Sequence, residues 1–183
     1  MLFLPLFFIG TSIAPLTGSK AWAGGLEVIV EGEPNFKIVR DVVHGAGLEG
    51  ALLKREGTAV ILTAPDGLEL ARANKGKEGE IVLSKSGVFS FTLIGDSEGY
   101  RIITPDGAMK NRIKLKADKF NLYDANGQRL AHGKPRPNGF GVKDEKGQQI
   151  LKIKGIYSLK EASFFTLPID SSMRIVAWGC EYL

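Results

Sequence analysis

Apolar and polar positions alternate through the middle of the chain in a pattern that recurs every twenty residues. Glycines mark the period at positions 47, 67, 87, 107, 127 and 147. An apolar side chain stands five residues before each of these glycines, and in four of the six units a second large apolar residue stands two positions earlier. Residues two apart lie on the same face of a β-strand, so each unit predicts a strand with one buried face that leads into a turn.

Four of the six glycines, all except Gly47 and Gly87, stand in sequences that are typical of β-turns. The clearest are Pro65-Asp66-Gly67, Pro105-Asp106-Gly107 and Ala125-Asn126-Gly127. Asp-Gly and Asn-Gly favour hairpins because the turn needs a positive φ, which glycine and asparagine tolerate. Twenty residues hold two strands of about six to eight residues and two short turns. We therefore predict one β-hairpin per unit, and about twelve antiparallel strands over residues 36–157.

An open sheet of about twelve strands would expose two long edges and curl strongly. Closing the sheet into a barrel removes both edges. A barrel of that size encloses more space than the strand side chains fill, so something else has to occupy the interior. The pattern therefore predicts a closed antiparallel meander with an occupant.

The C-terminal residues break the period and are apolar nearly all round. Asp170, Ser171 and Ser172 can cap the start of a helix over residues 171–183, in which Arg174 and Glu181 are the only charged residues. A helix without a polar face is buried or crosses a membrane, and this one is shorter than the roughly 20 residues that a bilayer requires. We expect this helix to fill the barrel, with Cys180 as an inert core thiol. The predicted fold class is all-β with one C-terminal helix.

This arrangement resembles a known group of proteins. Strand–turn–strand units such as residues 120–127 (Phe-Asn-Leu-Tyr-Asp-Ala-Asn-Gly), followed by an apolar C-terminal helix, are similar to the tubby C-terminal-like superfamily. That group includes tubby proteins, phospholipid scramblases and plant LURP-one-related proteins. The resemblance covers roughly residues 36–183 and implies a twelve-stranded barrel around a buried C-terminal helix. No segment matches tubby's phosphoinositide-binding residues or the scramblase calcium segment, so no activity is transferred to any residue.

The first residues form a separate segment. Residues 2–9 are apolar and uncharged, and Ala21-Trp22-Ala23 has the small residues that signal peptidase accepts at the first and third places. We predict a signal peptide over residues 1–23 and a single β-rich domain over residues 24–183, exported to the periplasm or secreted. No Lys or Arg precedes the apolar block, which departs from the usual pattern. The alternative is an uncleaved N-terminal membrane anchor, although the block is well short of the roughly 20 residues of a spanning helix.

Composition narrows the function classes. The chain is 44% hydrophobic and 24% charged, which excludes disorder over most of its length. Its single cysteine excludes an internal disulfide framework and a multi-cysteine zinc site. A net charge of +4 is mild and does not by itself indicate nucleic-acid binding. We expect neither a metal site nor a cofactor.

Basic residues alternate along one predicted strand, with a shorter run later in the chain. They are Lys110, Arg112, Lys114 and Lys116, then Lys152 and Lys154. A period of two places each run on one face, where the charges repel unless an anion or acidic neighbours lie close. One interpretation is a platform for an anionic lipid or glycan. The other is an ordinary solvated outer face, whose lysines discourage edge pairing.

Two histidines are the candidates for a general base. His44 has Asp41 nearby in the sequence, and His132 lies in Ala-His-Gly-Lys-Pro. Neither has a nucleophile at a spacing typical of a catalytic triad.

Three functions remain open at this point. The preferred one is an exported, non-enzymatic barrel that binds an anionic ligand or membrane surface through its basic strand face. The alternatives are a structural envelope protein with a protein partner, and a hydrolase-type enzyme that uses His44 or His132.

Overall fold

The computed structural model describes residues 25–31, 35–156 and 158–182, which form a β-barrel with two helices. The predicted signal peptide, residues 1–23, lies outside the described residues. The strands are β1 (Leu26–Val30), β2 (Phe36–Val39), β3 (Val42–Gly45), β4 (Ala51–Glu56), β5 (Ala59–Thr63), β6 (Glu69–Lys75), β7 (Ile81–Lys85), β8 (Val88–Asp96), β9 (Gly99–Ile103), β10 (Met109–Leu115), β11 (Phe120–Asp124), β12 (Arg129–Arg136), β13 (Gly139–Asp144) and β14 (Gln149–Lys154). The helices are α1 (Leu159–Phe164) and α2 (Ser171–Tyr182).

The strands form a closed antiparallel meander. Each strand pairs with its neighbours in the sequence, and β1 pairs with β14 to close the ring, with Glu27 opposite Lys154. The prediction of an all-β closed barrel is therefore confirmed. The barrel has fourteen strands rather than twelve. The six periodic glycines lie in the turns that join β3 to β14 pairwise, which accounts for twelve strands. Of the other two, β1 precedes the predicted range of residues 36–157, and β2 lies at its start.

Side-chain carboxylates stabilise several of the turns at one end of the barrel. In the β11–β12 turn, Asp124 Oδ1 accepts hydrogen bonds from the backbone amides of Asn126 at 3.0 Å and Gln128 at 2.7 Å. In the β13–β14 turn, Asp144 Oδ1 accepts from the Gln148 amide at 2.8 Å. These contacts are local turn chemistry, in which an aspartate carboxylate accepts hydrogen bonds from the backbone amides of the turn.

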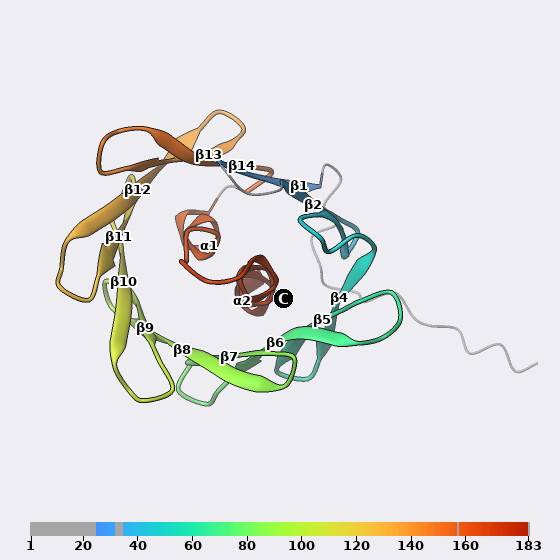
Figure 1. The fold of residues 1–183 in the computed structure, drawn as a ribbon. Coiled ribbons are helices and arrows are strands. Elements are labelled where there is room, and N and C mark those ends of the chain that lie inside the picture. Colours follow the sequence, from blue (N-terminus) through green and yellow to red (C-terminus); the bar gives the residue numbers. More distant parts are fainter. Residues whose placement is uncertain (1–24, 32–34, 157, 183) are drawn as a thin grey trace, which may run out of the picture.

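Both helices lie inside the ring (Figure 1). Ile175, Val176 and Ala177 of α2 are fully buried, and the helix lies against β5, β6 and β7. Asp170 accepts a hydrogen bond from the Ser172 amide at 2.9 Å, so it caps α2 as the sequence predicted. The prediction of a buried C-terminal helix is confirmed, whereas α1 was not predicted. In the described part of the chain, neither helix is long and apolar enough to cross a membrane.

Aromatic rings join the wall to the helices. Phe165, which follows α1, packs with its ring centroid 6.0 Å from that of Phe36 in β2 and 5.8 Å from that of Trp178 in α2. Phe164 lies 5.2 Å from Tyr100 of β9. Cys180 is also buried, and burial raises the pKa of its thiol. The interior is thus a packed core, and it holds the outer wall in a fixed shape.

Candidate functional site

The basic residues predicted on β10 lie among acidic neighbours. Arg112 Nη2 is 2.9 Å from Glu98 Oε2 and 3.3 Å from Asp96 Oδ2, and Lys114 Nζ is 3.1 Å from Glu98 Oε2. Both acids come from the β8–β9 hairpin. A hydrogen bond from the Glu98 amide lowers the pKa of Asp96, and the Arg112 charge lowers it further. The two central cations of this strand therefore already have counterions.

The two outer members of the β10 series do not extend a single charged face. Lys110 lies at a register shift between Met109 and Asn111, and its ammonium sits over the Phe91 ring, 4.8 Å from the centroid. Lys116 lies beyond the end of β10 and is exposed. The structure therefore brings Arg112 and Lys114 together and places Lys110 and Lys116 in different local settings.

A second basic region covers the outer surface of β12, β13 and β14. Two glycines of β13 lie between basic residues of its neighbours. Gly141 is the pairing partner of Lys134 and Lys152, and Gly139 is the partner of Arg136 and Lys154. Phe140 and Val142 point into the core, so Gly141 between them is directed to the outer face, whereas Gly139 lies against the backbone of Ile153 in β14. Because Gly141 has no side chain, the side chain of Arg136 can lie over the strand between the two basic neighbours.

The surface over β12, β13 and β14 contains two adjoining hollows. One, of about 290 Å³, is lined by His132, Lys134, Arg136, Gly141 and Lys143. The other, of about 310 Å³, is lined by Arg136, Pro137, Asn138, Gly139, Phe140, Gly141, Gln149, Lys152, Ile153 and Lys154. Arg136 and Gly141 belong to both, and we call the two hollows together the basic groove. A side chain at position 141 would enter it, because its Cβ would lie 3.2 Å from Arg136 Nε.

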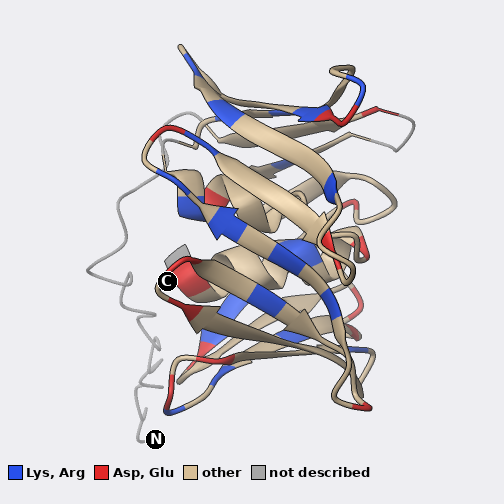
Figure 2. Ribbon diagram, turned by 90° about the vertical axis from the view of Figure 1, so that its left-hand side faces the viewer, with Lys and Arg blue, Asp and Glu red and all other residues tan. Residues whose placement is uncertain are grey.

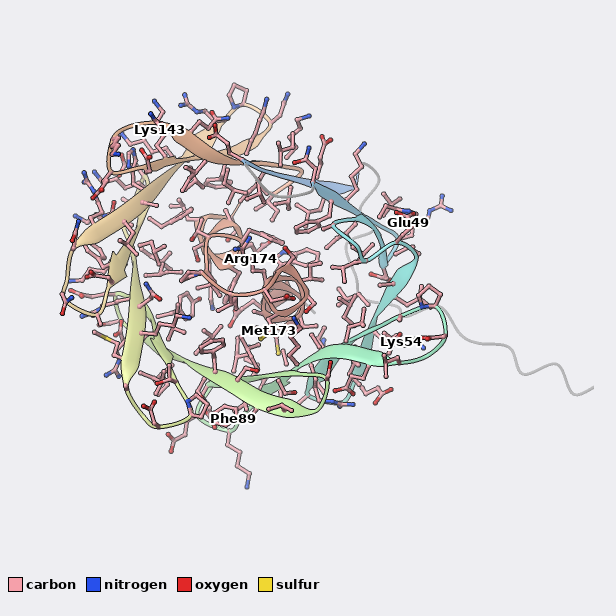
Figure 3. All side chains as sticks on the ribbon, viewed as in Figure 1. Glu49, Lys54, Phe89, Lys143, Met173 and Arg174 are labelled. Carbon is pink, nitrogen blue, oxygen red and sulfur yellow. The ribbon has the colours of Figure 1, made fainter. Side chains whose placement is uncertain are left out.

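The cations of the basic groove differ in their acidic neighbours. Lys154 Nζ is 2.6 Å from Glu27 Oε2, and this hydrogen bond lowers the pKa of Glu27, as does the nearby charge of Lys152. Within the described ranges, no ion pair is formed by Lys134, Arg136, Lys143 or Lys152. Lys143 projects outward from the barrel, whereas Arg174 lies inside it (Figure 3). Figure 2 shows an adjacent wall of the barrel, where Lys and Arg lie along the strands and many Asp and Glu lie at the turns.

His132 lies at the edge of the groove in an unusual environment. Its Nδ1 atom is buried and has no hydrogen-bond partner in the described part of the chain. Burial lowers the pKa of His132, and the positive charges of Arg129, Lys134, Lys143 and Lys119 lower it further. The imidazole is thus favoured in its neutral form beside several cations.

Sequence reasoning found only part of this groove. Of the six predicted basic residues, Lys152 and Lys154 line it. Lys134, Arg136 and Lys143 were missed, and His132 was considered only as a catalytic base. The signal was the period of two at positions 132, 134 and 136, which places these side chains on one face of β12. Only the pairing register of β12, β13 and β14 shows that Gly139 and Gly141 lie between basic residues.

The other histidine does not have the predicted neighbour. His44 Nδ1 is 2.8 Å from Glu49 Oε1, and both side chains are largely exposed, so His44 pairs with Glu49 rather than Asp41. Among the described residues, neither histidine has a hydrogen bond to a serine or cysteine. The same part of the chain contains no cluster of His, Cys, Asp and Glu that could hold a metal ion.

Comparisons with known proteins identify no family. No protein-family model matches the chain, and no curated protein matches its sequence. Among solved structures, the X-ray structure of a protein from Arabidopsis thaliana is similar, with 11% sequence identity and a TM-score of 0.40. That match covers 84% of this chain and 88% of the plant protein. The resemblance to the tubby C-terminal-like superfamily stays a prediction.

Proposed function

We propose that the protein is a non-enzymatic β-barrel domain that binds an anionic ligand in the basic groove. The observation that carries this proposal is a set of three cations, Lys134, Arg136 and Lys143, that line one hollow beside Gly141 and form no ion pair among the described residues. Strands in a sheet lie about 4.8 Å apart, so Lys134 and Lys152 approach within about 10 Å at the backbone on either side of Gly141. An anion between them would relieve their mutual repulsion.

The lining residues suit an oxyanion such as a phosphoryl or sulfo group. Arg136 offers a planar fork of N–H donors that can bind two oxygens at once, and the lysines offer compact positive charges. Arg136 is shared by both hollows, so a ligand with two anionic groups would contact it from each side. The predicted export of the chain, through residues 1–23, remains a separate proposal on which this groove does not depend.

Charge reversal in the groove tests the proposal. We expect Lys134→Glu combined with Lys152→Glu to weaken the binding of inorganic pyrophosphate by about tenfold or more, because two attractions become repulsions. Isothermal titration calorimetry at constant ionic strength measures the affinity.

Two matched variants separate the groove from a general effect of charge. Lys54→Glu with Lys77→Glu makes the same change in net charge at exposed lysines elsewhere on the barrel, and we expect a loss below about threefold because salt screens distant charges. Lys114→Glu with Lys116→Glu tests the β10 strand. Equal losses in all three variants would contradict a localised site. A large loss in the β10 variant alone would place binding on that strand instead.

A further inference from the structure

His132 is built into the basic groove with one ring nitrogen unsatisfied. The Nδ1 atom is buried without a hydrogen-bond partner in the described residues, and so is Oδ1 of Asn121, which pairs with His132 across β11 and β12. Buried polar atoms normally have partners, since each unsatisfied one costs about 1–3 kcal/mol. The hydrogen bonding of the His132 ring is therefore incomplete in the free protein.

After burial, the main influences on the pKa of His132 are four basic residues. On its own strand they are Arg129 and Lys134, from β13 comes Lys143, and from the residues before β11 comes Lys119. The neighbour on β11 itself is the neutral Asn121. Burial and these cations together disfavour a positive charge on the imidazole. The free protein thus keeps one weakly basic group neutral in an otherwise positive groove.

We propose that His132 takes up a proton when an oxyanion binds in the basic groove, so that the groove binds phosphoryl or sulfo groups more tightly as the pH falls. This inference rests on the proposed function and specifies how the site is regulated. An anion beside His132, Lys134 and Lys143 offsets the positive charges that keep the imidazole neutral. The imidazolium can donate from both ring nitrogens, whereas the neutral ring donates from one.

The direction of the pH effect follows from linkage between proton binding and anion binding. The pKa of His132 is lowered in the free protein, and a bound anion raises it because the anion stabilises the charged form. The bound state therefore holds more protons than the free state in the pH range between the two pKa values. Binding must strengthen as the pH falls through that range and become independent of pH on either side of it.

Inorganic sulfate is the appropriate probe, because its charge is constant across this range, whereas phosphoryl groups themselves titrate near pH 6. We expect the wild-type protein to bind sulfate about tenfold more tightly at about pH 5.5 than at about pH 8, the scale of one hydrogen bond to a charged group. His132→Asn should abolish this dependence. His132→Lys, with a permanent charge, should bind sulfate tightly at both pH values.

His44→Asn is the matched control, because His44 is an exposed histidine outside the groove. We expect it to keep the wild-type pH dependence. A direct readout comes from NMR titration of the His132 ring with sulfate or with chloride at equal ionic strength, where sulfate should raise the pKa of His132.

The outcomes separate the two proposals. Sulfate binding that does not vary with pH, or a pH dependence that survives in His132→Asn, would overturn the role of His132 and leave the groove as an anion site. No sulfate binding at either pH would overturn both proposals.

Discussion

Phe165→Ala is expected to lower the free energy of unfolding by about 3–5 kcal/mol. Phe165 is 1% exposed, and its ring lies between Phe36 of the barrel wall and Trp178 of α2. Removing the ring leaves a cavity at the point where wall and helix meet, and the closed barrel cannot collapse freely around it. Chemical denaturation followed by circular dichroism measures the change.

The control for this prediction is an exposed phenylalanine. Phe89 is 44% exposed, so we expect Phe89→Ala to change the free energy of unfolding by less than about 1 kcal/mol. Similar effects of the two substitutions would contradict a core in which the C-terminal segment is packed inside the barrel.

The second large effect is expected for Gly139→Ala, with a loss of about 2–4 kcal/mol in the free energy of unfolding. Gly139 has φ of 143°, a conformation that residues with a side chain rarely adopt. An added Cβ would also lie 2.0 Å from the carbonyl oxygen of Ile153, which belongs to the backbone of β14 and cannot rotate away. Either the strand pairing or the local backbone of the groove floor has to change. Thermal and chemical unfolding measure the loss.

Gly147→Ala separates the clash from the effect of a positive φ alone. Gly147 has φ of 83°, and an added Cβ would meet nothing within 4 Å. We expect this substitution to cost about 1–2 kcal/mol. If Gly139→Ala were no more destabilising than Gly147→Ala, that result would contradict the close packing of Gly139 against the backbone of β14.

The periodic part of the fold was predictable because its signal is local. Turn sequences such as Pro105-Asp106-Gly107 specify a hairpin from a few adjacent residues, and the six glycines in phase predicted the twelve strands β3 to β14. The β1–β2 hairpin has no glycine in that phase, so it was not predicted as a unit, and β1 lies outside the predicted range. The buried helix was predictable because α2 lacks a polar face. The short helix α1 lacks such a pattern, and its start depends on the Ser158 cap.

The candidate site was less predictable because it depends on strand register. The alternation in β10 indicates a common face, but it does not show that Glu98 lies beside Arg112 and Lys114. Likewise, no local pattern places Gly141 between Lys134 and Lys152. Charges on one strand can be read from the sequence, whereas their counterions and the space between them come from neighbouring strands.

The most direct test of a localised anion site is an NMR titration of the backbone amides with sulfate, in the wild type and in Gly141→Val. Position 141 has no positive φ, and a side chain there would meet the flexible Arg136 side chain, so the variant can fold while its net charge stays the same. We predict that sulfate shifts the amide signals of β12, β13 and β14 around Gly141 in the wild type. We expect the affinity for sulfate, measured from these shifts, to be about tenfold lower in Gly141→Val. Shifts centred on β10, or an unchanged affinity in Gly141→Val, would contradict binding in the basic groove.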